Sequence, residues 1–336
     1  MSKNGITVAG TLLADVFHSI DTYPGEGLLV RAEATGVSIG GIGNIILDLA
    51  RLDKDLEVNV SALLGEDEVA KSILDTLKKH KNIRTDCIVC RGESSRTLVF
   101  NSRDTKQRTF FFIPASSDRF CLTHIDFSKI DSKIFLLEYL LLLEAVDSPD
   151  PEYGTHGARI LAEARRRGMK TAIDMVSEAS DRAKSIVTSA LRYTDICCIN
   201  ELEASAVTGI PLAELCSEDE KAAESAARSA MLAIEDLGVT EWIVIHKKDH
   251  AWGYDCKAKK FESLESLKLP EGYIKGSTGA GDAYLSGILY GAHEGYSLID
   301  SMHLARATAA ASLSENNGTD GMRPLSEVKA LEQLYK

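Results

Sequence analysis

The chain has 336 residues, 44% of them hydrophobic and 26% charged, which is typical of a soluble globular protein with one large α/β domain or two smaller ones. The formal net charge of −12 argues against a general nucleic-acid binder and against a protein that lies on an anionic membrane. Seven cysteines, an odd number, and the absence of a visible secretory signal predict a reducing, cytoplasmic location with free thiols.

The first predicted strand, Ile6–Gly10, is followed closely by Asp15. Open α/β sheets bind their ligands just beyond strand ends, although Asp15 could also be a solvated loop acid. Gly40, Gly41 and Asn44 then precede a helix predicted over 45–52. Glycine lets the backbone approach a ligand closely, and the Asn44 amide can donate and accept hydrogen bonds with a polyol.

Segment 41–46 could also be read as the dinucleotide fingerprint of a dehydrogenase. Three features argue against that reading: the third small residue is missing, the preceding strand is not a first Rossmann strand, and no acidic residue ends a second strand at the required place. A dehydrogenase is therefore disfavoured.

Two stretches, about 12–37 and 87–114, contain short strand-like runs and no convincing helix. We expect them to form one small sheet beside the main domain. The run Phe110–Phe112 is either ordinary strand core or an exposed apolar face that seeks a partner. Cys87 and Cys90 form a Cys-x-x-Cys pair, but no second pair stands at zinc-site spacing, so we expect strand thiols rather than a metal site.

From residue 134 onward, strands and helices alternate. The most apolar run, 136–146, is interrupted by two glutamates and is too short to span a bilayer. The expected elements that follow are a helix at 155–167, a strand at 171–174, helices at 182–191 and 219–237, strands at 196–199 and 242–246, and a helix at 298–313. Such alternation predicts parallel βαβ units in a doubly wound, mostly parallel sheet flanked by helices. We expect one domain over 1–336, with the small sheet inserted.

Asn200 and Glu203 follow the strand at 196–199 and share one face of a helical turn. They could form a capping box or carry function. Lys247 lies after the strand at 242–246 and could be a solvated base or a phosphate contact.

The strongest chemical signal is the turn 276–282, which leads into an amphipathic helix. Gly279, Ala280 and Gly281 have almost no side chains, so their amides can bind an anion at the positive end of the helix dipole. A carboxylate beside that anion suits a general base, so Asp282 is the predicted acceptor of a hydroxyl proton. The alternative is an ordinary helix N-terminus with an acidic residue in its first turn.

These motifs, in this order, resemble those of the PfkB (ribokinase-like) carbohydrate kinases. The resemblance implies a ribokinase-like fold in which the small sheet is a lid over the acceptor and often a dimer contact. It implies that Asp282 is the base, that the Gly279–Gly281 amides form the anion hole, and that Glu203 helps to hold Mg²⁺, mostly through water. Acceptor binding then falls to Asp15, Gly40, Gly41 and Asn44, and nucleotide binding to Asn200, Lys247, Thr278 and Gly318.

The resemblance implies ATP and Mg²⁺ as cofactors and transfer of the γ-phosphoryl group to a carbohydrate hydroxyl. A nucleoside kinase of the same fold and a non-catalytic sugar-binding regulator are the alternatives. The expected partner is a small-molecule sugar or nucleoside, with no nucleic acid and no membrane, and a homodimer could form through the lid. Gly276 replaces the aspartate that usually helps to bind a monovalent cation in the family, so potassium activation is in doubt.

Overall fold

The computed structural model describes residues 4–105, 107–178 and 182–336. Within these residues, one large sheet has the strand order β15-β14-β13-β12-β11-β8-β1-β4-β5. The parallel strands of this sheet are β1 (Ile6–Gly10), β4 (Val58–Leu64), β5 (Ile83–Cys90), β8 (Ile134–Leu140), β11 (Lys170–Met175), β12 (Ile196–Asn200) and β13 (Trp242–His246). The antiparallel strands β14 (His250–Asp255) and β15 (Lys260–Glu265) extend it beyond β13.

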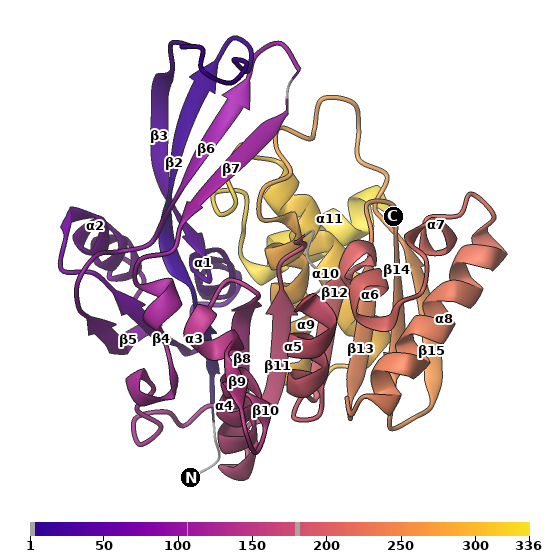
Figure 1. The fold of residues 1–336 in the computed structure, drawn as a ribbon. Coiled ribbons are helices and arrows are strands. Elements are labelled where there is room, and N and C mark those ends of the chain that lie inside the picture. Colours follow the sequence, from indigo (N-terminus) through magenta and orange to yellow (C-terminus); the bar gives the residue numbers. More distant parts are fainter. Residues whose placement is uncertain (1–3, 106, 179–181) are drawn as a thin grey trace.

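Helices cover both faces of the large sheet (Figure 1). One core includes side chains of α1 (Gly43–Leu52), α2 (Glu68–Leu77), α9 (Ala280–Glu294), α10 (Leu298–Leu313) and α11 (Leu325–Tyr335). The other includes side chains of α4 (His156–Arg166), α5 (Arg182–Leu191), α6 (Glu201–Thr208), α7 (Leu212–Leu215) and α8 (Glu220–Asp236). Successive residues of β8 alternate between them, with Leu136 in the first core and Leu137 in the second. The predicted doubly wound sheet is therefore confirmed.

The small sheet consists of β2 (Leu12–Ile20), β3 (Glu33–Gly41), β6 (Arg96–Ser102) and β7 (Arg108–Ile113), in the order β3-β2-β6-β7. Strand β2 runs antiparallel to β3 and parallel to β6, and β6 runs antiparallel to β7. Figure 1 shows this sheet projecting beyond the end of the large sheet where the parallel strands finish. It therefore stands next to the edge at which ligands of such sheets bind.

One expected boundary is wrong. The sequence predicts that 87–114 belongs to the small sheet, but Cys87 and Cys90 lie in β5, which pairs with β4 at the edge of the large sheet. The physical reason is the helix α2, which connects β4 to β5 as a βαβ unit and returns the chain to the same sheet. The small sheet receives its second pair of strands only from residue 96 onward.

The remaining short elements are α3 (Glu144–Asp147), two single-turn 3₁₀ helices (Ser117–Arg119 and Leu122–His124), and the paired strands β9 (Pro149–Asp150) and β10 (Gly154–Thr155). All seven cysteines are free thiols. Among the described residues, no helix is both long enough and apolar enough to cross a membrane.

Candidate active site

Helix α9 begins directly after the turn that the sequence singled out. Gly279 is its N-cap and has a φ of 76°, a left-handed conformation that favours glycine. A Cβ on Gly279 would lie 2.6 Å from the Cα of Gly318, so the two backbones are in close contact. No side chain caps the helix. The sequence predicts that the amides of Gly279, Ala280 and Gly281 bind an anion at this helix start, and the Ala280 amide also donates to the Ser277 carbonyl over a long 3.4 Å.

Asp282 is the third residue of α9, and its side chain is buried. Its Oδ1 accepts a hydrogen bond from the Tyr139 hydroxyl at 2.5 Å, and its Oδ2 accepts one from the Asn44 amide at 2.7 Å. Burial raises the pKa of Asp282, while these two hydrogen bonds oppose the rise. Each oxygen accepts one hydrogen bond from these side chains and keeps a second lone pair for a substrate hydroxyl.

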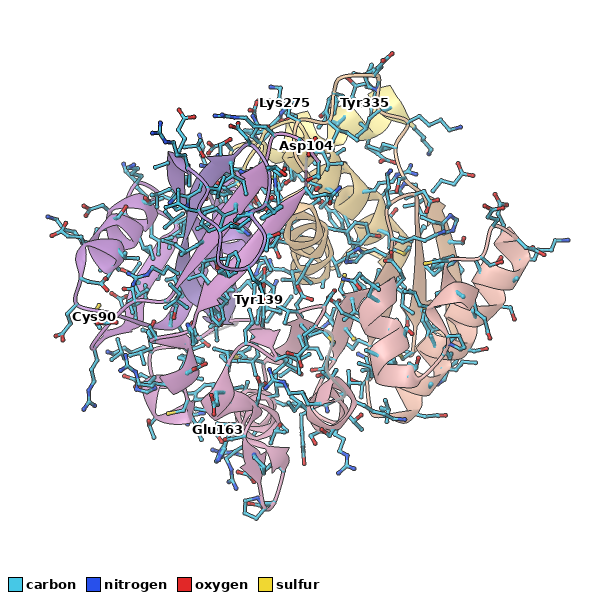
Figure 2. All side chains as sticks on the ribbon, turned by 45° about the horizontal axis from the view of Figure 1, so that its top comes forward. Cys90, Asp104, Tyr139, Glu163, Lys275 and Tyr335 are labelled. Atoms are coloured by element: carbon cyan, nitrogen blue, oxygen red, sulfur yellow. The ribbon has the colours of Figure 1, made fainter. Side chains whose placement is uncertain are left out.

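Tyr139 was not predicted. It lies near the carboxyl end of β8, and burial raises its pKa well above the usual value, so the phenol keeps its proton and remains a donor. Figure 2 shows Tyr139 near the centre of the view.

Two further acids, the buried Glu138 and the partly buried Asp174, gather beside Asp282. Single carboxylate oxygens of Glu138, Asp174 and Asp282 all lie within 4.8 Å of one another. Glu138 is fully buried, and neither of its carboxylate oxygens has a hydrogen-bond partner among the described residues. Burial, followed by repulsion between the carboxylates, raises the pKa of Glu138 and of Asp174 well above their usual values. An unpartnered oxygen within such a group fits a hard divalent cation such as Mg²⁺.

Asn200 and Glu203 form the capping box that the sequence left open as one alternative. The backbone N–H of Glu203 donates to Asn200 Oδ1, and the backbone N–H of Asn200 donates to Glu203 Oε2, each at 2.9 Å. Ser177 Oγ donates to the other Glu203 oxygen at 2.9 Å. Burial raises the pKa of Glu203 to about 7, and the Glu203 charge contributes to the raised pKa of Asp174. Glu203 thus lies beside the three-carboxylate group, and its role toward magnesium stays a prediction.

The predicted acceptor residues meet on the other side of Asp282. A Cβ at Gly40 would collide with the Asp15 carboxylate, and Gly41 has a φ of 60° and lies against the Thr11 carbonyl. Burial is the main cause that raises the pKa of Asp15 to about 6, and the nearby Asp282 charge adds to it. Asn44 touches Asp282 directly. Both glycines are therefore required by close packing around Asp15 and β2.

A cleft of about 1200 Å³ opens on the opposite side of the same turn. Ser277, Ala280 and Gly281 line one end, and the rest of the wall includes Lys247, Leu264, Ile274 and Leu313. Lys247 Nζ lies 3.1 Å from Asp249 Oδ1 and 5.4 Å from the centre of the Trp252 ring. His246 also lines the cleft and stacks on Tyr284, and burial lowers its pKa to about 4. The cleft joins a polar end, suited to phosphates, to an apolar wall.

The other predicted nucleotide residues lie around this cleft rather than in its wall. Gly318 packs against Gly279 and against the Asn44 side chain. Thr278 accepts a hydrogen bond from Arg108, which reaches it from β7 of the small sheet. Arg108 was not predicted, and its contact joins the small sheet to the turn in front of α9.

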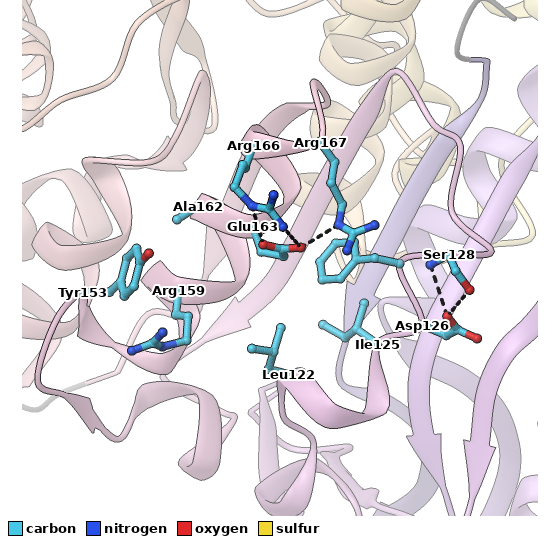
Figure 3. Close-up of a pocket in the computed structure, with 11 residues that line it drawn as sticks. Leu122, Ile125, Asp126, Ser128, Tyr153, Arg159, Ala162, Glu163, Arg166 and Arg167 are labelled. Atoms are coloured by element: carbon cyan, nitrogen blue, oxygen red, sulfur yellow. Dashed lines mark hydrogen bonds and ion pairs between the residues drawn. The ribbon is translucent and has the colours of Figure 1, made fainter.

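A second hollow, of about 450 Å³, lies beside α4, away from these residues (Figure 3). Its arginines are already paired: Arg159 with Asp150 at 2.6 Å, and Arg166 and Arg167 with Glu163 at 2.9 Å and 2.6 Å. None of the predicted site residues lines this hollow.

Comparisons with known proteins identify the family and the fold. A model of the pfkB family of carbohydrate kinases matches residues 5–324. Among solved structures, ribokinase from Arabidopsis thaliana, complexed with ribose and ATP, is 19% identical, with a TM-score of 0.79 and coverage of 99% of each chain. Ribokinase from Thermotoga maritima is 18% identical, with a TM-score of 0.77 and coverage of 98% of this chain and 99% of that one.

A nucleoside kinase from Methanocaldococcus jannaschii is 15% identical, with a TM-score of 0.75 over the whole of both chains. No sequence among the curated proteins matches significantly. At these identities the solved structures show the fold alone. The family model covers nearly the whole chain, and with it the α9 turn and the residues around Asp282, so the protein belongs to the pfkB family of carbohydrate kinases.

Proposed function

We propose that this protein transfers the γ-phosphoryl group of ATP to a hydroxyl group of a carbohydrate. The observation that carries the proposal is Asp282, a buried carboxylate in the first turn of α9, held by Asn44 and Tyr139 between the acceptor residues and the large cleft. Phosphoryl transfer needs little covalent chemistry from a protein. It needs positioning, a base and stabilisation of negative charge.

In this mechanism the acceptor hydroxyl lies against Asp282, which takes its proton as the acceptor oxygen bonds to the γ-phosphorus. The bond between that phosphorus and the oxygen bridging to the β-phosphate breaks, and ADP leaves with the electron pair. The amides of Gly279, Ala280 and Gly281 donate to the negative charge that develops on the transferred group. Asp15, Gly40, Gly41 and Asn44 orient the acceptor. The raised pKa of Asp282 makes it a stronger base than an exposed aspartate.

The donor nucleotide would occupy the 1200 Å³ cleft, with its phosphates toward Ser277 and Gly281 and near Lys247 and Thr278. Glu138 and Asp174 would hold Mg²⁺ directly, and Glu203 would act on it through water together with its partner Asn200. When bound, the ion would neutralise charge on the phosphates. Thr278 and Gly318 support the turn on which the phosphates lie.

Gly276 bears on whether the protein binds a monovalent cation. A Cβ on Gly276 would lie 2.9 Å from the Asn316 carbonyl oxygen and 3.0 Å from that of Glu315. The turn therefore has little room for an aspartate and offers no charge. We propose that potassium is not required.

Some of the solved relatives are carbohydrate kinases by name, such as a fructokinase from Xylella fastidiosa with bound ATP. They support ATP as donor. The intact Asp282 argues against a regulator without turnover. The homodimer through the small sheet remains a prediction, which the exposed Val37 and Phe111 on that sheet favour.

The test is ATP consumption, at fixed Mg²⁺, against a panel of sugars and nucleosides, with the parent and Asp282→Asn. Loss of a general base should reduce kcat by roughly 10²–10⁴-fold while ATP still binds. Asp300→Asn is the matched control, because Asp300 is the third residue of the next helix, α10, and is exposed. Equal kcat values for the parent and Asp282→Asn would remove Asp282 from the role of base.

A further inference from the structure

Strand pairing fixes which side chains share a face of the small sheet. Asp15 pairs with Thr97, and Thr97 pairs with Phe112. Two residues further along, Phe17 pairs with Val99, and Val99 pairs with Phe110. Directly paired residues point to the same side of a sheet, and so do residues two apart on one strand. These side chains therefore lie on one face, which we call the inner face: Asp15, Thr97 and Phe112, then Phe17, Val99 and Phe110, then Ser19, Asn101 and Arg108.

Both ends of the inner face reach the turn that begins α9. At one end, the Asp15 carboxylate packs against Gly40, and Asn44, four residues further along the chain, donates a hydrogen bond to Asp282 at 2.7 Å. At the other end, Arg108 donates a hydrogen bond to Thr278, four residues before Asp282. The inner face is thus tied to the active site at both ends, and the row between them covers the acceptor side of Asp282.

That middle row is apolar and aromatic. Phe110 is 56% exposed although it points toward the site, and Phe17 is partly exposed. The neighbouring Phe111 points to the opposite face and packs edge-on against Phe100, with ring centres 5.6 Å apart. The two phenylalanines of the middle row, by contrast, have no aromatic partner among the described residues. Polar groups flank them, with Asp15 and Thr97 on one side and Asn101 and Arg108 on the other.

We propose that the acceptor is a nucleoside, whose pentose lies against Asp15 and Asn44 and whose planar base packs against Phe17 and Phe110. A bare pentose held by Asp15 and Asn44 would leave the rings of Phe17 and Phe110 without a planar partner. A heteroaromatic base has an apolar face that stacks on phenylalanine, and such stacking is tolerant of the base. The inference rests on the proposed function, because it places the base beside the hydroxyl that Asp282 deprotonates.

The experiment compares kcat/KM for ribose, fructose and five nucleosides with ATP and Mg²⁺. Calorimetry measures the affinity for each acceptor with ADP saturating, so that a nucleoside cannot bind in the donor cleft. We expect nucleosides to exceed ribose at least tenfold in both measurements. Phe110→Ala should raise KM for the preferred nucleoside roughly 5- to 150-fold, the range for loss of one base–aromatic stack. Leu232→Ala, which also truncates an exposed apolar side chain but lies on α8, away from the small sheet, is the control and should change neither value.

The outcomes separate this inference from the proposed function. Better turnover of ribose or fructose than of any nucleoside would overturn the inference and leave the kinase assignment intact. Tight nucleoside binding without phosphorylation of any acceptor would support the base-binding face and overturn the kinase assignment. Equal effects of Phe110→Ala and Leu232→Ala on the nucleoside KM would also overturn the inference.

Discussion

Tyr139→Phe should move the acid limb of the pH–rate profile to higher pH. The substitution removes only the hydroxyl that donates to Asp282 Oδ1 at 2.5 Å, and the Asn44 bond to the other oxygen remains. Because the phenol stabilises the ionised carboxylate, its loss raises the pKa of Asp282 further above the usual value. Activity requires ionised Asp282, so more of the enzyme becomes inactive as the pH falls.

The size of the shift follows from the strength of the bond. A hydrogen bond to a charged group contributes about 1.5–3 kcal/mol, and about 1.4 kcal/mol corresponds to one pKa unit. The acid limb of kcat/KM should therefore rise by roughly one to two pH units. The assay is initial-rate ATP consumption between pH 5 and 9 in buffers of equal ionic strength, with subsaturating acceptor and fixed Mg²⁺.

Tyr153→Phe is the control, because Tyr153 lies in the remote hollow beside α4 against Arg159. It should leave the profile unchanged. An acid limb that stays in place for Tyr139→Phe, with a normal fold by thermal unfolding, would refute the idea that Tyr139 sets the basicity of Asp282.

Three further predictions concern other parts of the site. Glu203→Gln should shift the Mg²⁺ dependence of the rate but hardly change thermal stability, because glutamine can still accept from the Asn200 amide; an unchanged Mg²⁺ titration would leave only the capping role. Activity should differ little between potassium, sodium and a bulky organic cation at equal ionic strength, and several-fold activation by potassium would contradict our reading of Gly276. The folded-state pKa of His246, about 4, lies below its ordinary 6.5, so the unfolded chain takes up this proton first as the pH falls. The free energy of unfolding should therefore fall by up to about 3 kcal/mol between pH 7.5 and 4 because of His246. In His246→Gln, measured by denaturant unfolding, the free energy should fall less over the same range, by that amount.

The alternating half of the fold could be predicted because its signals are local. The helices expected at 182–191 and 298–313 have those bounds in the structure, since apolar spacing and flanking turn residues mark them. The β14–β15 hairpin was missed because His250–Asp255 follows charged residues that read as a loop. The prediction for residues 87–90 is wrong because the sequence of a short strand does not determine which sheet it joins.

The candidate site was predictable where one short segment carries the chemistry. The turn before Asp282 is such a segment, and so are Gly40, Gly41 and Asn44. Tyr139 and Arg108 could not be found, because each meets its partner across more than a hundred residues. Glu138 and Asp174 left a weaker signal: both stand near the carboxyl ends of neighbouring parallel strands, which meet at the same edge of the sheet. In the sequence alone, Glu138 is no more than an interruption of an apolar run.

The bond between Arg108 and Thr278 has a consequence for the timing of turnover. If the small sheet acts as a lid in the proposed reaction, it must break this bond to open, so acceptor entry and product departure would share one barrier. Opening would also remove the Arg108 hydrogen bond from the turn in front of α9, on which the phosphates of ATP would lie. In the open enzyme the γ-phosphate would then be poorly positioned for attack by water. We therefore expect slow ATP hydrolysis in the absence of an acceptor. We also expect product release, rather than phosphoryl transfer, to limit kcat.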